Sequence, residues 1–113
     1  KIANFNLYKN LLQDVKDIKF VNELDYCNFI PFRAPVTVKK LNGLCKYLEN
    51  NSIQSRGFFY PLHNQPCFNT LNIINEYPNS NFLYNNGLAL PVYPSLKEKD
   101  IIYVCDKIRE YYK

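Results

Sequence analysis

The residues best suited to chemistry lie together in one stretch of the chain, RGFFYPLH, residues 56–63. Arg56 offers a rigid guanidinium fork for a carboxylate or a phosphate. His63, the only histidine of the chain, can donate, accept or shuttle a proton near neutral pH. Tyr60 adds a hydroxyl group and Phe59 adds a ring face. We interpret the stretch as an irregular loop, where binding residues are common. The alternative is a buried loop in which Arg56 and His63 only satisfy backbone carbonyls.

Other kinds of catalytic or binding site have less support. Cys67 follows His63 closely, but no third group is evident that would orient such a nucleophile pair. Acidic residues lie mostly on predicted helix surfaces or in a turn, so they favour no acid–base pair. Three scattered glycines exclude a glycine-rich phosphate loop. The aromatic residues are not interleaved with basic ones, so we assign them mainly to the core rather than to a surface that stacks nucleic-acid bases.

The cysteines are spaced too widely for a metal site. They are Cys27, Cys45, Cys67 and Cys105. No CxxC pair occurs and only one histidine is present, whereas zinc sites draw on close ligand pairs. A secreted disulfide framework stays open because the count is even, but the chain is apolar enough to fold without one. We therefore expect reduced thiols in a cytoplasmic protein, and no bound metal.

Length and composition are those of one small globular domain. The chain has 113 residues, of which 47% are hydrophobic and 21% are charged, values that argue against wholesale disorder. Its net charge of +4 is weaker than the dense basic stripe of a nucleic-acid module. No apolar run has the length of a membrane span, and no signal peptide is evident. Because the sequence lacks Met and begins at Lys1, we expect a piece cut from a longer protein.

Apolar residues at intervals of three and four predict three helices that would position this stretch. The first spans residues 2–15, and the second spans residues 38–49 with Thr37 as its N-cap. The third begins at a capping box formed by Ser95 and Glu98. Its predicted buried stripe consists of Ile101, Cys105, Ile108 and Tyr112.

Extended segments between these helices predict a small sheet. They cover residues 18–21, 26–33, 53–59 and 88–93, and the second is rich in aromatic residues that strands favour. Residues 60–68 contain two prolines and form a loop. The order of elements predicts an α+β fold, a small α/β sandwich in which helices pack on one face of a short, largely antiparallel sheet. The other face would stay exposed unless a larger body covered it.

Two separated motifs then point to a known family. RGFFYPLHNQP, residues 56–66, resembles the R-x-F-F-x-P-L-H-x-Q-P segment of the DegT/DnrJ/StrS sugar aminotransferases. GLALPVYPSL, residues 87–96, resembles the G-L-x-L-P-x-Y-P-S-L segment of the same family, and it follows after a spacer of the expected length. The closing helix, residues 97–112, is also similar. The likeness covers nearly the whole chain and is strongest from residue 53 onward.

The resemblance implies a pyridoxal-phosphate-dependent enzyme with the aspartate-aminotransferase fold (fold type I). Such enzymes transfer an amino group, usually from glutamate, to a keto-sugar attached to a nucleotide. Residues 1–113 resemble only the C-terminal small domain, a single domain whose large cofactor-binding partner domain is absent. The Schiff-base lysine belongs to that large domain, so the resemblance implies no catalytic residue in this chain and predicts that it is inactive alone. It also implies a homodimer with active sites at the subunit interface.

By the same resemblance, four residues would contact the substrate. His63 would lie near the sugar nucleotide or the cofactor, and Arg56 would bind a donor carboxylate or a substrate phosphate. Tyr60 and Phe59 would shape the pocket. The alternatives are a freestanding α/β module that binds a small anion through Arg56 and His63, and an interaction domain that uses its aromatic residues as anchors.

Overall fold

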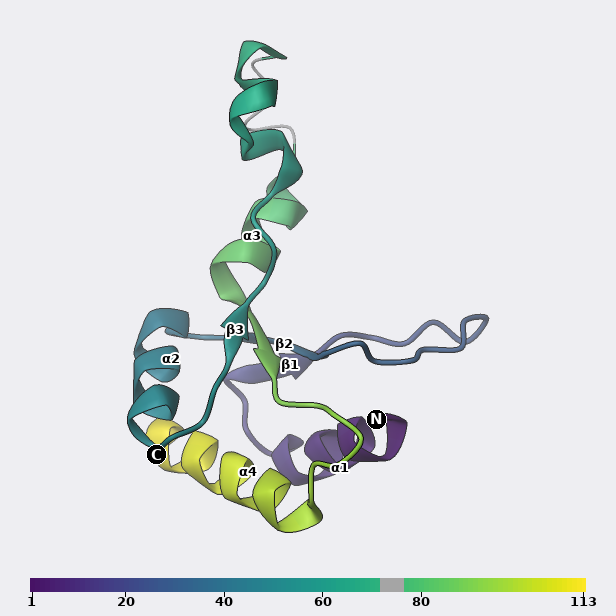
Figure 1. Cartoon of the computed structure of the whole chain (residues 1–113), viewed down its shortest axis with the longest axis vertical. Coiled ribbons are helices and arrows are strands. Elements are labelled where there is room, and N and C mark those ends of the chain that lie inside the picture. The colour runs from purple at the N-terminus through teal and green to yellow at the C-terminus, as the bar shows by residue number, and fades with distance from the viewer. Residues whose placement is uncertain (72–76) are drawn as a thin grey trace.

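The chain is described by a computed structural model that places residues 1–71 and 77–113 (Figure 1). Its helices are α1 (Ile2–Leu12), α2 (Leu41–Asn50), α3 (Pro78–Asn86) and α4 (Glu98–Tyr112), with short 3-10 helices η1 (Leu62–Asn64) and η2 (Pro66–Leu71). Its strands are β1 (Ile18–Phe20), β2 (Ala34–Val38), β3 (Arg56–Gly57) and β4 (Gly87–Leu90). None of these helices has the length and apolar character of a membrane span in the part of the chain that is described.

The strands form one sheet in the order β1-β2-β4-β3, and every neighbouring pair is antiparallel. Alternation along β2 directs Ala34, Val36 and Val38 into the core, while Pro35 and Thr37 face the other way. All residues of β4, which lies between two strands, are buried. The predicted α+β fold with a largely antiparallel sheet is therefore confirmed.

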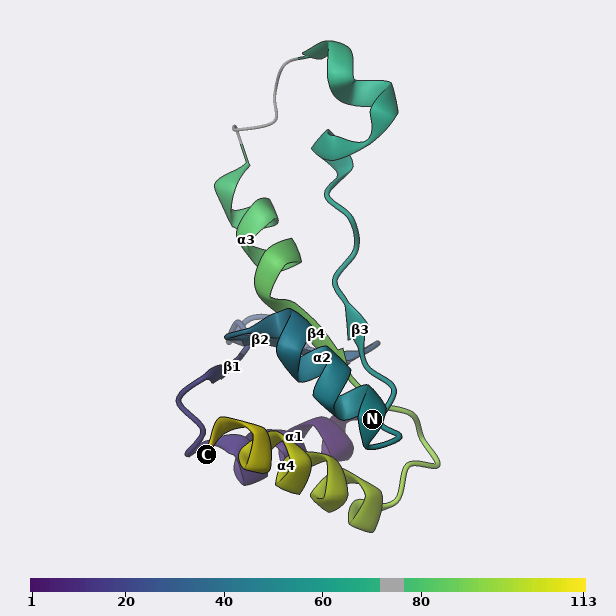
Figure 2. The same ribbon diagram turned by 90° about the vertical axis from the view of Figure 1, so that its left-hand side faces the viewer.

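A layer of helices covers one face of this sheet. Helices α1 and α4 lie beside each other under the sheet, and α2 packs against α4 (Figures 1 and 2). The buried residues are Phe5, Tyr8 and Leu12 of α1, Leu44 and Leu48 of α2, and Ile101, Val104, Cys105 and Ile108 of α4. The Arg109 guanidinium of α4 donates hydrogen bonds to the backbone oxygen of Leu11 and to Asp14, which fastens α4 to the end of α1.

A long arm rises from the sheet on the side away from α1 and α4 (Figures 1 and 2). We call residues 58–71 and 77–86 the arm, and the remaining described residues outside 21–32 the base. The radius of gyration of 15.4 Å exceeds the value of about 13 Å expected for a compact domain of this length. Among the arm residues whose burial is described, only Pro61 and His63 are buried. The arm is therefore a projection with almost no core of its own.

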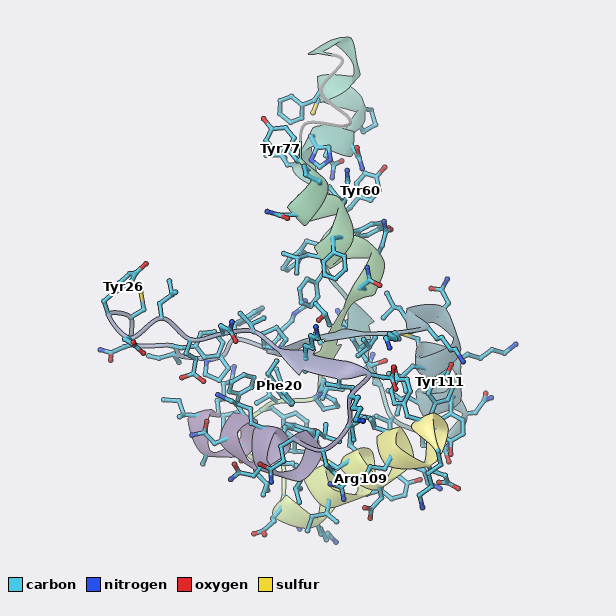
Figure 3. All side chains as sticks on the ribbon, turned by 180° about the vertical axis from the view of Figure 1, so that it is seen from behind. Phe20, Tyr26, Tyr60, Tyr77, Arg109 and Tyr111 are labelled. Atoms are coloured by element: carbon cyan, nitrogen blue, oxygen red, sulfur yellow. The ribbon has the colours of Figure 1, made fainter. Side chains whose placement is uncertain are left out.

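A second projection is the loop of residues 21–33 between β1 and β2, whose Tyr26 lies far from the base (Figure 3). The strand predicted over residues 26–33 is wrong, because those residues form this loop and β2 begins only at Ala34. Pro35 lies inside β2, one residue beyond the β1 ladder. At Pro35 the strand has a neighbour on one side only, so the missing amide hydrogen is tolerated there.

Helix starts also differ from their predictions. Thr37 belongs to β2, and α2 begins after Lys40, whose φ of 54° is in the left-handed region. Helix α4 begins at Glu98 after an N-cap at Lys97, and no side chain caps it, so the predicted capping box of Ser95 and Glu98 is wrong. The end of the first helix differs too, because α1 ends at Leu12 instead of continuing to residue 15. Side-chain caps at Thr37 and Ser95 are not needed there, because strand pairing and helix packing already determine where α2 and α4 begin.

Candidate functional site

The residues predicted to contact substrate occupy two places in the structure. Arg56 lies in β3 at the edge of the base, whereas Phe59, Tyr60 and His63 lie on the arm. Arg56 is exposed, and so are Phe59 at 76% and Tyr60 at 50%. His63 is only 7% exposed. The predicted anion-binding residue and the predicted histidine thus belong to different parts of the molecule.

His63 is held on the arm by a hydrogen bond and a ring contact. It lies in η1, and its Nε2 is 2.9 Å from Oδ1 of Asn81 in α3. The Tyr77 ring packs on the imidazole with a centroid separation of 4.9 Å and an interplanar angle of 31°. Nδ2 of Asn64 also approaches Oδ1 of Asn81, at 3.5 Å. These contacts join the outgoing and returning sides of the arm.

The partner of Nε2 determines which ring nitrogen of His63 is available to a ligand. An amide oxygen only accepts hydrogen bonds, so the network assigns the ring proton to Nε2. In the described residues, Nδ1 has no hydrogen-bond partner. The His63 side chain is nearly buried, with 7% exposure, so the ring keeps only a small contact with solvent. In the neutral ring Nδ1 accepts a hydrogen bond from a hydroxyl or ammonium group, and in the protonated ring it donates to an anion.

The two aromatic residues before His63 make different contacts. The Tyr60 ring meets Tyr84 of α3 edge-on, with centroids 5.3 Å apart and planes at 90°; Tyr60 and Tyr77 both lie on the arm in Figure 3. The Phe59 ring lies 4.9 Å from the guanidinium carbon of Arg33. Phe59 therefore links the root of the arm to a second arginine of the base.

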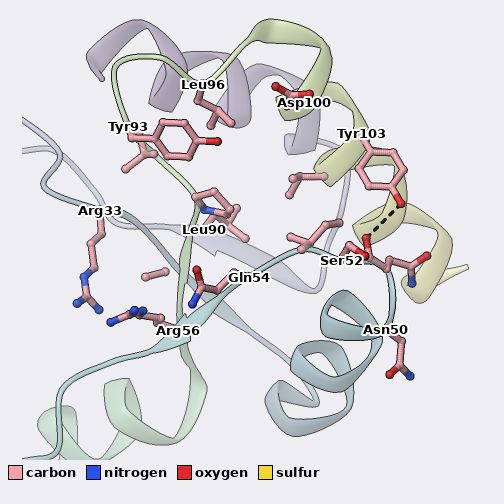
Figure 4. Close-up of a pocket in the computed structure, with 16 residues that line it drawn as sticks. Arg33, Asn50, Ser52, Gln54, Arg56, Leu90, Tyr93, Leu96, Asp100 and Tyr103 are labelled. Carbon is pink, nitrogen blue, oxygen red and sulfur yellow. Dashed lines mark hydrogen bonds between the residues drawn. The ribbon is translucent and has the colours of Figure 1, made fainter.

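A groove of about 720 Å³ opens beside Arg56. It lies between the β3–β4 edge of the sheet, the end of α2 and the start of α4, with Arg33 and Arg56 at one end and Asp100 at the other (Figure 4). The Tyr103 hydroxyl donates a hydrogen bond of 3.2 Å to the backbone oxygen of Asn51 across the far side. The groove is thus cationic at the arginine end and acidic at the other.

Two residues of these sites, Arg33 and Asn81, were not predicted from the sequence. Arg33 lies 23 positions before Arg56, and only the pairing of β2 and β3 with β4 brings the two together. Asn81 lies in an asparagine-rich segment that offers no local reason to select one asparagine. A predicted antiparallel register would have been needed to find Arg33, and a predicted pairing of η1 with α3 to find Asn81.

The pairing of Cys67 with His63 as a nucleophile and base finds no support. Cys67 is exposed, at the start of η2, and Nε2 of His63 is engaged with Asn81. In the described part of the chain, no hydrogen bond or ring contact joins the Cys67 thiol to the imidazole. The arrangement around His63 is that of a binding group rather than of an activated thiol.

The lysines of this chain do not fit a Schiff-base role. All eleven lie in the described part of the chain, and each is exposed or only half-buried. None of them lines the groove. A lysine that bonds to pyridoxal phosphate needs an enclosed position beside the cofactor, so the residues present here do not form that site.

Comparison with known proteins gives a family and a fold. The model of the DegT/DnrJ/EryC1/StrS aminotransferase family matches residues 1–109. The chain is 38% identical over 71 residues to the GDP-perosamine synthase of Vibrio cholerae, a match covering 63% of this chain and 19% of that protein. The matched part thus spans about a fifth of the length of this relative.

Solved structures share the whole arrangement of base and arm. S. venezuelae DesV superposes with a TM-score of 0.92 at 18% identity, over 99% of this chain and 31% of DesV. The sugar aminotransferase CalS13 from Micromonospora echinospora gives a TM-score of 0.87 at 16% identity, over 96% of this chain and 29% of CalS13. At these identities the likeness shows the fold.

Proposed function

Because the chain belongs to the DegT/DnrJ/EryC1/StrS aminotransferase family, we propose that it is the C-terminal small domain of a pyridoxal-phosphate-dependent sugar aminotransferase. The reaction proposed is the transfer of an amino group from glutamate to a nucleotide-linked keto-sugar. The family match supports the amino transfer, and the similarity to a GDP-perosamine synthase supports the nucleotide-linked sugar. Residues 1–113 would form one domain, with the remaining two thirds of a DesV-like chain outside it.

The observation that best supports this proposal is the state of His63. It is the one buried polar or charged residue among those whose burial is described, and it lies on an arm whose only other such buried residue is Pro61. Asn81 and Tyr77 contact its ring, and no described residue occupies its Nδ1. We assign to Nδ1 the role of accepting a hydrogen bond from a sugar hydroxyl or from the amino group in transfer. Tyr60 and Phe59 would border the same ligand, and Arg56 would bind an anionic group.

The arm also supports a homodimer in which a second subunit covers it. Its described surface exposes several large apolar residues, namely Phe59, Tyr60, Leu62, Tyr77, Phe82, Leu83 and Tyr84. An exposed apolar surface of this kind is typical of an interaction site. The proposed arrangement places the arm at the contact between subunits, where active sites of the family are expected.

The cofactor proposal is supported by the family, and not by residues of this chain. Pyridoxal phosphate supplies the electron sink for amino transfer, while the protein orients the reacting groups. Since the lysines here do not fit the Schiff-base role, we assign the cofactor's binding residues to the rest of the protein. We also propose a cytoplasmic location, which the four free cysteines support because unpaired thiols are typical of reducing compartments.

The test is a visible absorption spectrum of the full-length protein loaded with pyridoxal phosphate. The expected result is a cofactor band that changes on addition of glutamate and is restored by a nucleotide-linked keto-sugar. His63→Gln should retain the response to glutamate and lose sugar turnover, whereas Lys46→Gln, an exposed change on α2, should leave both unchanged. A well-folded protein with no cofactor band would overturn the proposal.

A further inference from the structure

Arg33 and Arg56 form a pair of positive charges without a counter-ion. Both line the groove, and Figure 4 draws both at the same end of it. Neither guanidinium group has an ion pair or a hydrogen bond in the described part of the chain. The third arginine, Arg109, contrasts with them, because it is paired with Asp14 at 2.7 Å. Two like charges held together are unfavourable unless an anion joins them.

The order of the strands places the two arginines on either side of β4. Arg56 pairs with Ala89 of β4, and Ala89 also pairs with Pro35 of β2. Arg33 lies one residue before β2, and Arg56 lies in β3, so the two arginines flank β4. Both line the groove together with Ala89, which is itself buried.

Arg33 is also held in place by aromatic rings. Its guanidinium carbon lies 4.9 Å from the Phe59 ring centroid and 5.7 Å from that of Phe32. Stacked against these rings, the guanidinium loses little further freedom when it binds a ligand. Phe59 belongs to the arm and Phe32 to the loop of residues 21–33, so both projections meet the base at this arginine.

We propose that Arg33 and Arg56 bind a phosphate group of the ligand at the arginine end of the groove. This inference rests on the proposed function and names the part of the nucleotide-linked sugar that the base would bind. A phosphate or diphosphate carries enough charge to neutralise both arginines, and its oxygens match two guanidinium forks. A single carboxylate would neutralise only one of them. Asp100 at the far end of the groove confines the anionic part of a ligand to the arginine end.

The test measures binding of inorganic pyrophosphate to the full-length protein with its cofactor bound, so that the cofactor's own phosphate site is filled. Wild type, Arg33→Gln and Arg56→Gln are compared by calorimetry, with Lys46→Gln as a control that removes one charge outside the groove. Each arginine change should weaken pyrophosphate binding about tenfold or more, as expected for a hydrogen-bonded charge, and Lys46→Gln should not. Arg33→Lys should recover only part of the affinity, because it keeps the charge and loses the fork and the stacking.

Two results would overturn the assignment. One is pyrophosphate binding that none of the arginine changes weakens. The other is weaker binding of glutamate with unchanged binding of pyrophosphate, which would assign the pair to the donor's carboxylate. Failure of the proposed function would be seen separately, as a wild-type protein whose cofactor spectrum does not change on addition of glutamate. That measurement does not involve the arginine variants. Thermal unfolding of each variant confirms that a loss of binding does not reflect a loss of fold.

Discussion

The base and the arm differ in what happens to their large apolar side chains. In the base, Leu44, Leu48, Ile101 and Ile108 are fully buried between the helix layer and the sheet. In the arm, α3 has no buried residue, and its Leu83 is 39% exposed. Both regions therefore contain large apolar side chains, which are buried in the base and exposed to solvent in the arm.

The difference teaches where the stability of each region comes from. Buried apolar area stabilises the base, as in most small domains. A helix as short as α3 is marginal by itself, and the arm adds local contacts such as the bond between His63 and Asn81. Its exposed apolar residues would gain stability only from a body that covers them. The arm is thus held by local contacts and not by a core of its own.

The largest effect is expected when the same substitution is made in both regions. Leu48→Ala removes a fully buried side chain of α2 and should lower the free energy of unfolding by about 2–5 kcal/mol. Leu83→Ala, on the exposed arm, should change it by less than about 0.5 kcal/mol. Chemical denaturation of the two variants at several protein concentrations checks this contrast.

Concentration dependence shows how far the contrast holds. If Leu83→Ala lowers the free energy of unfolding only at concentrations where the protein is dimeric, a second subunit covers the arm. An equal cost for Leu48→Ala and Leu83→Ala at every concentration would contradict the distinction between base and arm.

The junction of the two regions offers a second pair of matched changes. A Cβ at Gly87 would collide with the Phe58 ring and with the backbone oxygen of Leu83, whereas one at Gly57 has nothing within 4 Å. Gly87→Ala should therefore displace the root of the arm and lower the free energy of unfolding by about 1–3 kcal/mol. Gly57→Ala should leave stability unchanged or slightly higher. Equal stabilities of the two variants in thermal denaturation would show that the arm adjusts freely at its root.

The sequence predicts the base better than the arm, for a physical reason. Helix stripes such as Ile101, Cys105 and Ile108 depend on local periodicity, and their burial is confirmed. The strand predicted over residues 26–33 failed because composition does not determine which extended segment pairs. Pairing with β4 selected residues 34–38 instead, although they contain Pro35. The register between strands depends on segments that lie far apart in the chain, and a single sequence carries little information about it.

The candidate site divides in the same way. His63 was predicted because it is the only histidine and lies in a recognisable motif. Arg33 and Asn81 were not, because sheet register brings one to Arg56 and the folding back of the arm brings the other to His63. The predicted N-caps failed for a similar reason. Thr37, for example, belongs to strand β2, which the helix pattern does not reveal.

A smaller difference between the regions is expected in alkaline solution. Burial raises the pKa of Cys105 in the base from 9.0 to about 12, whereas Cys67 on the arm is exposed. The Cys105 contribution to stability is fully present below pH 9 and is lost as the pH rises towards 12, because the unfolded thiol ionises first. The slope of unfolding free energy against pH above 9 should be shallower for Cys105→Ala and unchanged for Cys67→Ala. Identical slopes for all three proteins would mean that the thiol is not buried.

The smallest expected effect concerns the hydrogen bond between His63 and Asn81 on the arm. Asn81→Leu removes the acceptor of the His63 Nε2 proton, so the tautomer with the proton on Nδ1 should gain population by about two- to tenfold, the value of one hydrogen bond. Asn79→Leu, on the same helix and exposed, is the matched control. Nitrogen chemical shifts of the labelled ring, assigned with His63→Gln, report the tautomer directly. A tautomer ratio that ignores Asn81→Leu would mean that packing against Tyr77, and not the hydrogen bond, orients the imidazole.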